Sequence, residues 1–302
     1  MIEILLAAYN GERYIREQVQ SILDQTFTDW HLTAADDGSA DSTYDILLGY
    51  AADYPHKISV YRNDPGTGSS KANFMSLLGR ADADIIAFSD QDDVWDSGKL
   101  ALIAKRMDMS VPMLIHTDAR VVSSDLTEKA PSFMAYQGLD PRAVTLNKLL
   151  AQNNVTGCTM AINRKLMDIV RMGIPGDMLM HDWWAALAAA AFGRILCLPD
   201  ATVSYRQHED NVLGAVNNRS VSGVRRIMSD TDGVKARLRA TFTQAQAFYE
   251  TYRDMLPDDK KQIIEAYLAI PDKGKISRVL AILKGGYTKQ NFMSAIGQII
   301  YC

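Results

Sequence analysis

Three aspartates within four residues, Asp90, Asp92 and Asp93, form the most chemically suggestive cluster of this 302-residue sequence. They follow the apolar run IIAF, so they stand where a buried strand is expected to end. Crowded carboxylates repel one another and lose hydration, which costs stability unless positive charge lies among them. The Asp90-x-Asp92 spacing suits Mg2+ or Mn2+, because it points two oxygen ligands the same way on an extended chain. A solvated loop with an aspartate capping the next helix is the structural alternative.

Two other polar clusters follow apolar runs earlier in the chain, AAYNGE (7–12) and ADDGSAD (35–41). The glycine of the second cluster permits a tight turn, and its serine or last aspartate can cap a helix. Only one of Asp36 and Asp37 is needed for that turn, so the other is available to a nucleobase or ribose. Tyr9 precedes an Asn-Gly turn, so its ring can stack on a base, although strand-end tyrosines more often lie in the core.

The elements that would position these clusters alternate regularly over the first hundred residues. Apolar runs predict strands, and apolar residues at helical spacing predict helices between them. Such alternation predicts an α/β fold with a mostly parallel sheet covered on both faces, which binds ligands at the carboxyl ends of its strands. We therefore expect the three clusters to meet along one edge. The predicted strands are 2–9, 30–35, 57–62 and 84–89, and the predicted helices are 12–23, 41–52, 70–78 and 96–109.

The rest of the chain is less regular. Residues 126–140 read as a loop, and the pattern after about 215 is helical. We expect a catalytic domain over 1–215, with halves 1–110 and 111–215, and a helical region over 216–302. Further strands are predicted at 112–122, 158–162 and 194–205, and further helices from 164 and at 181–192.

Composition limits the class of protein. The net charge of −4 excludes an obvious nucleic-acid binder, although the segment 219–302 alone carries a charge of +6. Three cysteines without CxxC spacing argue against a disulfide framework and against zinc, and they fit a reducing compartment. No apolar run is long enough for a signal peptide or a membrane span. We therefore expect a cytoplasmic protein.

The basic C-terminal segment also has amphipathic patterning. Packing into the core or a homodimer interface explains this pattern, and a helix at the inner membrane surface is the alternative. The apolar residues of the pattern are Leu280, Ile282, Leu283, Phe292, Ala295, Ile296, Ile299 and Ile300, with Arg278 and Lys284 close by.

Taken in order, the motifs resemble those of the inverting nucleotide-sugar glycosyltransferases of family 2, which have the GT-A fold. The N-terminal matches are AAYNGERYIREQVQSILDQTFTDW, ADDGSAD and FSDQDDVW. The later matches are NVTGCTMAINRKL (154–166), MHDWW (180–184) and YRQHEDNVLG (205–214), which look most like a rhamnosyltransferase-like branch. The first 110 residues carry most of the resemblance, and the segment after about 220 adds little.

The resemblance implies a role for each matching residue. Asp182 matches the family's catalytic base, although its place at a helix start also suits an N-cap. Trp183 and Trp184 would form walls on the acceptor side, with core packing expected for at least one. Lys71 could equally be a surface lysine, and His208 a structural histidine. The implied donor-site residues are Ala7, Tyr9, Asn10, Asp36, Asp37, Lys71, Asp90 and Gln91, and the implied metal ligands are Asp90, Asp92, Asp93 and His208.

The predicted function is inverting transfer of a sugar, with rhamnose favoured, from a UDP or dTDP donor with Mn2+ or Mg2+. The acceptor would be a hydroxyl of a saccharide or lipid-linked saccharide in cell-surface polysaccharide synthesis. Three alternatives remain open. A polyprenyl-phosphate glycosyltransferase would use a phosphate acceptor, and a non-catalytic nucleotide-sugar binder would not turn over. A nucleotidyltransferase is disfavoured because the chain lacks a glycine-rich phosphate loop near its N-terminus.

Overall fold

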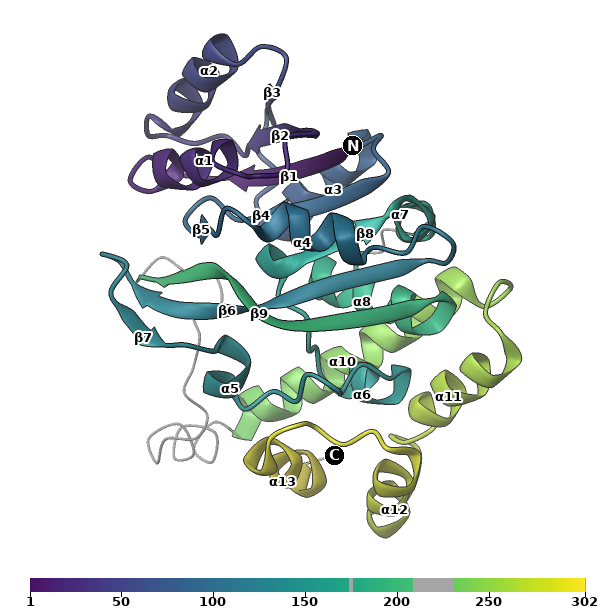
Figure 1. The fold of residues 1–302 in the computed structure, drawn as a ribbon. Coiled ribbons are helices and arrows are strands. Elements are labelled where there is room, and N and C mark those ends of the chain that lie inside the picture. Colours follow the sequence, from purple (N-terminus) through teal and green to yellow (C-terminus); the bar gives the residue numbers. More distant parts are fainter. Residues whose placement is uncertain (174–175, 209–230, 302) are drawn as a thin grey trace. The chain divides into compact units, whose positions relative to one another are not determined.

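The computed structural model describes residues 1–173, 176–208 and 231–301 (Figure 1). The chain divides into two compact units. The first comprises Met1–Phe133, Thr156–Arg171 and Leu196–Gly214, and the second comprises Met134–Val155, Met172–Ile195 and Ala215–Cys302. The domain boundary predicted after residue 215 lies outside the described residues and stays a prediction, and residues 209–214 of the last motif also lie outside. Within the described part of the chain, no helix combines the length and apolar character needed to cross a bilayer.

One half of the sheet in the first unit is parallel, as the alternation predicts. The order of these strands is β3-β2-β1-β4, and β1 lies at the centre because nearly all its residues are apolar and buried (Figure 1). In the register of β1 and β2, Ile2 pairs with Trp30 and Ala8 with Asp36. The strands are β1 (Ile2–Ala8), β2 (Trp30–Asp36), β3 (Ile58–Arg62) and β4 (Ile85–Ser89).

The other half of the sheet is antiparallel, so the parallel arrangement ends at β4. The order continues β8-β6-β9-β5, and β7 pairs with the far end of β6. The loop predicted over 126–140 is wrong, because this segment contains β7 and the short helix α5 (Phe133–Gln137). The strands are β5 (Val94–Trp95), β6 (Met113–Ser123), β7 (Glu128–Ala130), β8 (Met160–Asn163) and β9 (Arg194–Gln207).

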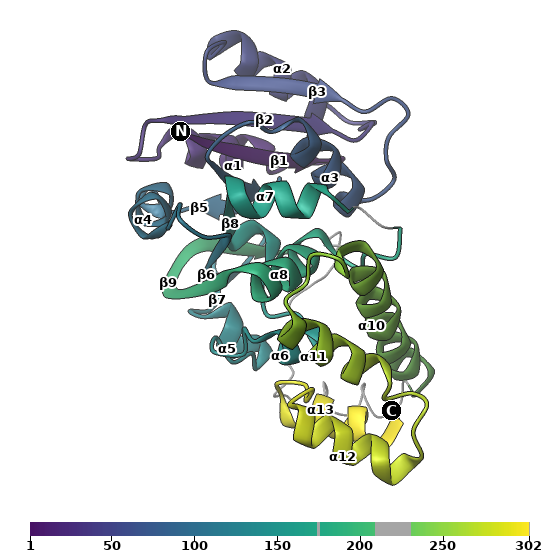
Figure 2. The same cartoon turned by 90° about the vertical axis from the view of Figure 1, so that its right-hand side faces the viewer.

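Helices cover the parallel strands in two packed pairs (Figure 2). Helices α1 and α2 contact each other, and α3 packs against α7 and against β1. Helices α1, α2 and α3 follow parallel strands, so the loops that precede them lie at the carboxyl edge of those strands. Helix α7 follows the antiparallel strand β8 and begins at the opposite edge, beside the start of β4. The helices are α1 (Ile15–Leu23), α2 (Thr43–Asp53), α3 (Ser70–Arg80), α4 (Lys99–Arg106) and α7 (Arg164–Arg171), and a 3-10 turn, η1 (Gly157–Thr159), precedes β8.

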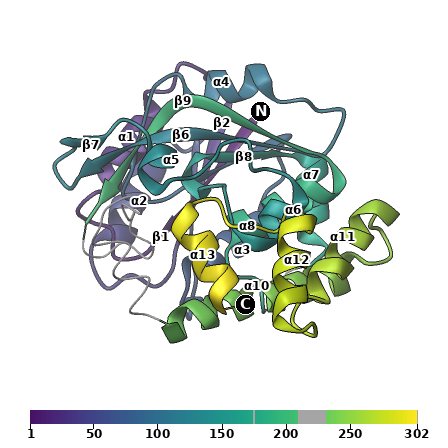
Figure 3. The same cartoon turned by 90° about the horizontal axis from the view of Figure 1, so that it is seen from below.

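The second unit is helical in its described residues. Helix α10 packs against α6, α11 and α13, and α11 also contacts α12 (Figures 2 and 3). Its core is aromatic, with the ring of Trp184 against those of Phe248 and Tyr252 at 5.1 and 5.9 Å. The helices are α6 (Leu146–Ala151), α8 (His181–Phe192), α10 (Thr231–Tyr252), α11 (Asp258–Leu268), α12 (Lys275–Gly285) and α13 (Phe292–Tyr301).

A buried asparagine fixes β8, the strand that joins the two halves of the sheet. The Oδ1 atom of Asn163 accepts from the N–H groups of Met113 and Leu166 at 3.1 and 3.0 Å. Its Nδ2 atom donates to the carbonyls of Asp108 and Val111 at 2.8 and 2.6 Å. All four partners are backbone groups, so one side chain joins β8 to the turn before β6.

Asn163→Ala should lower the free energy of unfolding by about 3 kcal/mol, because buried backbone groups lose their partners. Urea unfolding followed by circular dichroism measures this loss. Asn147→Ala is the matched control, since its amide donates one hydrogen bond, to the Gly285 carbonyl, and should cost only about 1 kcal/mol. Equal losses in the two variants would contradict the role given to Asn163.

Candidate functional site

The loops after β1 and β2 are joined at the carboxyl edge of the sheet. The Asn10 N–H donates to Ser39 Oγ at 2.9 Å, and Asn10 Oδ1 accepts from the Ala40 N–H at 2.9 Å. The φ of Asn10 is +48°, a left-handed conformation that asparagine tolerates better than most residues. The Asn10 amide oxygen is therefore engaged within the protein, where it holds two predicted clusters side by side.

Gln91 holds the backbone of Tyr9 from both sides. The Tyr9 N–H donates to Gln91 Oε1 at 2.7 Å, and Gln91 Nε2 donates to the Tyr9 carbonyl at 2.8 Å. A Cβ at Gly11 would lie 2.3 Å from the same Oε1 atom, so a larger residue there would displace the amide. Tyr9 is 57% exposed, which leaves its ring available for stacking. Ala7, two residues before Tyr9, lies in β1 and pairs with Ala35 of β2.

Asp36 is the aspartate that builds the turn. It is fully buried, and its Oδ2 atom accepts from the N–H groups of Gly38 and Ser39 at 3.2 and 3.0 Å. The same oxygen lies 3.4 Å from Nε of Arg62. Gly38 has a φ of +81°, which favours glycine at this turn.

Asp37 holds the segment after β3. Its Oδ1 atom accepts from Asn63 Nδ2 and from the Thr67 N–H at 2.9 and 2.7 Å, and its Oδ2 atom accepts from Thr67 Oγ1 and from the Gly68 N–H. Burial alone would raise the pKa of Asp37, but these hydrogen bonds outweigh it and lower the pKa. Asp37 therefore fixes the rim of the predicted base pocket, and direct contact with a base stays a prediction.

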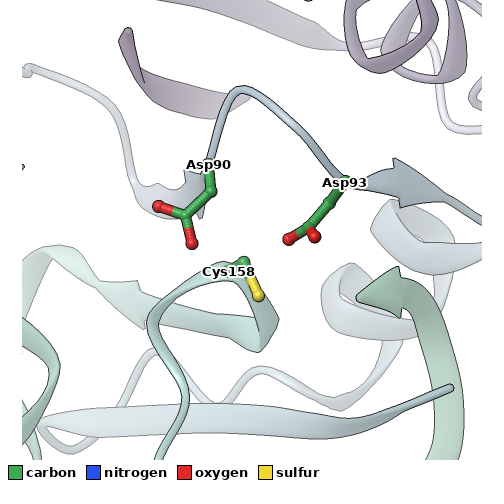
Figure 4. A group of neighbouring side chains, drawn as sticks. All are labelled: Asp90, Asp93 and Cys158. Carbon is green, nitrogen blue, oxygen red and sulfur yellow. The ribbon is translucent and has the colours of Figure 1, made fainter. Parts of the chain in front are cut away.

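Within the aspartate cluster, Asp90 and Asp93 turn toward Cys158 (Figure 4). One ligand atom from each of the three residues lies within 4.8 Å of the others. Burial raises the pKa of Cys158 well above its usual value, and the charge of Asp93 adds to this effect. A soft sulfur ligand suits Mn2+ and Mg2+ less well than carboxylate, carbonyl or water oxygens do, so the trio is not an all-oxygen site of the kind these ions prefer.

Lys99 lies beside the trio, and burial lowers its pKa to about 8. It is fully buried, its Nζ atom donates to the Cys158 carbonyl, and it lies 3.8 Å from the ring centroid of Trp95. Burial and the charge of Asp92 raise the pKa of Asp93, and the Lys99 charge is among the interactions that oppose this rise. Asp93 is therefore buried with its charge only partly offset, and the metal-ligand role predicted for it stays a prediction.

Arg206 ties the aspartate loop to β9. Its side chain is 2% exposed, its N–H donates to Asp93 Oδ1 at 3.1 Å, and its Nε donates to the Asp92 carbonyl at 2.7 Å. The guanidinium also forms an ion pair with Glu17 of α1 and lies 4.5 Å from the Tyr14 ring centroid. Arg206 therefore sets the position of the Asp92 backbone and, two residues on, of His208.

Asp92 and His208 form the pair that best fits a divalent cation. His208 Nε2 lies 2.7 Å from Asp92 Oδ2, and the side chains are 11% and 15% exposed. The His208 ring also packs on Tyr14, with centroids 4.9 Å apart. One carboxylate oxygen and one imidazole nitrogen suit Mn2+, and partial exposure leaves room for diphosphate oxygens and water. Asp92 and His208 therefore fit a divalent cation such as Mn2+.

The predicted base and acceptor walls belong to the second unit. Asp182 lies in the first turn of α8, where Oδ1 accepts from the Trp183 N–H and from Asn153 Nδ2, the latter at 3.1 Å. Trp183 is half-buried and donates from Nε1 to the Leu149 carbonyl at 2.6 Å. Trp184 is fully buried in the aromatic core, so its predicted role as a sugar-contacting wall is wrong.

Arg206 and Lys99 were not predicted from the sequence, and the donor contact predicted for Gln91 stays a prediction. One signal for Arg206 was present, because residues two apart on a strand face the same side and Arg206 precedes His208 by two. No signal marks Lys99, since lysines are almost never fully buried. Lys71 lies in the first turn of α3, and its phosphate contact stays a prediction.

Solved structures with similar folds are glycosyltransferases. TarS of S. aureus, crystallised with UDP-GlcNAc, aligns with a TM-score of 0.55 at 15% identity, covering 99% of this chain and 90% of that one. The mannosyltransferase PcManGT of Pyrobaculum calidifontis, in complex with GDP-Man and Mn2+, aligns with a TM-score of 0.56 at 19% identity, covering 94% and 72%. These similarities confirm the predicted GT-A fold.

Curated sequences agree with the fold. A dTDP-rhamnosyl transferase, RfbG of Shigella flexneri, is 29% identical over 220 residues, 70% of this chain and 74% of that protein. The UDP-Glc:alpha-D-GlcNAc-diphosphoundecaprenol beta-1,3-glucosyltransferase WfgD of Escherichia coli is 26% identical over 168 residues, 56% of this chain and 62% of that protein. The family model described as Glycosyl transferase family 2 matches residues 3–169. The chain therefore belongs to glycosyl transferase family 2.

Proposed function

We propose that this protein transfers a sugar from a nucleotide-diphosphate donor to a hydroxyl of a saccharide or lipid-linked saccharide, inverting the anomeric carbon. Polysaccharide synthesis is the setting that the names of its relatives support. The observation that carries the proposal is the Asp92–His208 pair, in which Nε2 and Oδ2 lie 2.7 Å apart and both side chains are partly exposed. Gln91, in the same loop as Asp92, holds the backbone of the exposed Tyr9.

The donor would lie along the carboxyl edge of the sheet. Tyr9 would stack on the base, and the rim that Asp37 builds from Thr67 and Gly68 would border it. Asp92 and His208 would hold Mn2+ or Mg2+. A dTDP or UDP donor is favoured, with rhamnose suggested by the RfbG relative and a UDP-sugar by TarS and WfgD.

Asp182 would act on the acceptor. When bound, a divalent cation would offset the negative charge that develops on the departing diphosphate. The acceptor oxygen bonds to the anomeric carbon as the bond to the diphosphate breaks, and the hydroxyl proton passes to Asp182. Asn153 and the α8 N-terminus hold this carboxylate in one orientation. A single displacement from the opposite face inverts the configuration.

Asp92→Ala should abolish the metal-dependent stabilisation by a nucleotide sugar. Ligand binding to the native state at 100 times Kd contributes about 2.7 kcal/mol, which a thermal-shift assay detects. The assay compares UDP-, dTDP- and GDP-sugars with and without Mn2+. Asp168→Ala, an exposed aspartate on α7, is the matched control and should keep the full shift. An undiminished shift in Asp92→Ala would contradict the assignment.

Asp182→Asn should lower kcat about 10²–10⁴-fold while the KM for the donor changes little, because the base is lost and the donor site is intact. Steady-state assays of nucleotide release with a saccharide acceptor measure both constants. Asp177→Asn, an exposed aspartate before the same helix, should retain full activity. Full activity of Asp182→Asn would instead favour a phosphate acceptor, as in polyprenyl-phosphate transfer, which needs no strong base.

A further inference from the structure

Helix α12 presents an apolar face to solvent. Ile276 is 79% exposed, Leu280 48% and Leu283 51%, and their spacing of four and three residues places them on one side of the helix. Ile282, on another side, is 1% exposed and anchors α12. Three large exposed apolar side chains in a row are unusual for a surface with no partner. We call Ile276, Leu280 and Leu283 the α12 face.

The start of α12 is joined to the end of α13. Lys275, the residue before Ile276, donates from Nζ to the carbonyl of Ile300, and Ile300 is itself 53% exposed. The exposed apolar residues differ from those of the amphipathic pattern predicted from the sequence. Ile282 belongs to the core, Ile276 joins the exposed face, and Ile296 and Ile299 are partly buried.

The charge around this face is mainly positive. From Lys273 to the C-terminus the sequence has five basic residues and no acidic residue, and the exposed Asp272 directly precedes this segment. Lys273 and Lys284 are exposed at the two ends of α12, and Arg278 donates to the carbonyls of Lys273 and Pro271. A second copy of the same face would bring the same positive charges against it, which disfavours a symmetric dimer here. An anionic surface would complement both the charges and the apolar face.

We propose that the α12 face lies in the headgroup region of a bilayer that contains anionic lipid. An eleven-residue helix is too short to cross the hydrocarbon, but it can lie along the interface with its apolar side inward and its lysines at the phosphates. Membrane binding itself does not depend on catalysis. Its consequence, that the acceptor is a lipid-linked saccharide reached at the membrane surface, rests on the proposed function.

Flotation of the full chain with vesicles tests the proposal without any donor or acceptor. Binding is expected to phosphatidylglycerol-phosphatidylcholine vesicles, to weaken as salt is added, and to be absent with phosphatidylcholine alone. The double variant Leu280→Glu, Leu283→Glu should bind at least tenfold more weakly, since two carboxylates would have to enter the interface. Leu48→Glu, at a leucine of α2 with 41% exposure, is the matched control and should bind as the unmodified chain does.

A second variant guards against misfolding of the first. Lys273→Glu with Lys284→Glu leaves the apolar face intact and should also reduce binding to anionic vesicles. No binding of the unmodified chain, or unchanged binding in both double variants, overturns the proposal. A dimer in solution that Leu280→Glu, Leu283→Glu disrupts, without vesicle binding, would assign the face to a second copy and overturn it equally. The nucleotide-sugar thermal shift is measured separately, so failure of membrane binding leaves the donor site untouched.

Discussion

The buried guanidinium of Arg206 is the interaction on which the site depends. It joins β9 to the aspartate loop through the Asp92 carbonyl, to the end of β6 through the Ser124 carbonyl, and to α1 through Glu17 and the Tyr14 ring. A buried charge is stable only where its hydrogen bonds are met, and here each partner comes from a different part of the first unit. These partners therefore offset the cost of burying the guanidinium, and the guanidinium in turn fixes the backbone that carries Asp92.

The two adjacent aspartates of the loop, Asp92 and Asp93, point in different directions. Asp93 points inward, where Lys99 and the Arg206 N–H offset its charge, while Asp92 points toward His208 and solvent. The Lys99 side chain therefore offsets part of the cost of crowding these carboxylates. Family membership and the fold agree with a glycosyltransferase, and our proposal assigns the diphosphate end of the donor to the neighbourhood of Asp92.

The parallel half of the fold was predictable because its signals are local: each strand is an apolar run that ends in a polar cluster. The antiparallel half was not, since β5 pairs with β9 more than a hundred residues away and no local pattern specifies that partner. Within α8, nearly every residue is apolar, so the sequence could not tell the buried Trp184 from the half-buried Trp183. Lys99 was hidden for a similar reason, because only tertiary packing decides that a lysine is buried.

The most direct test of this account is anomalous diffraction from crystals grown with Mn2+ and a nucleoside diphosphate. We predict one manganese ion bound by Asp92 and His208 and in contact with diphosphate oxygens, with Asp93 still hydrogen-bonded to the Arg206 backbone. Manganese among Asp90, Asp93 and Cys158, or a diphosphate bound with no ion near Asp92, would contradict it.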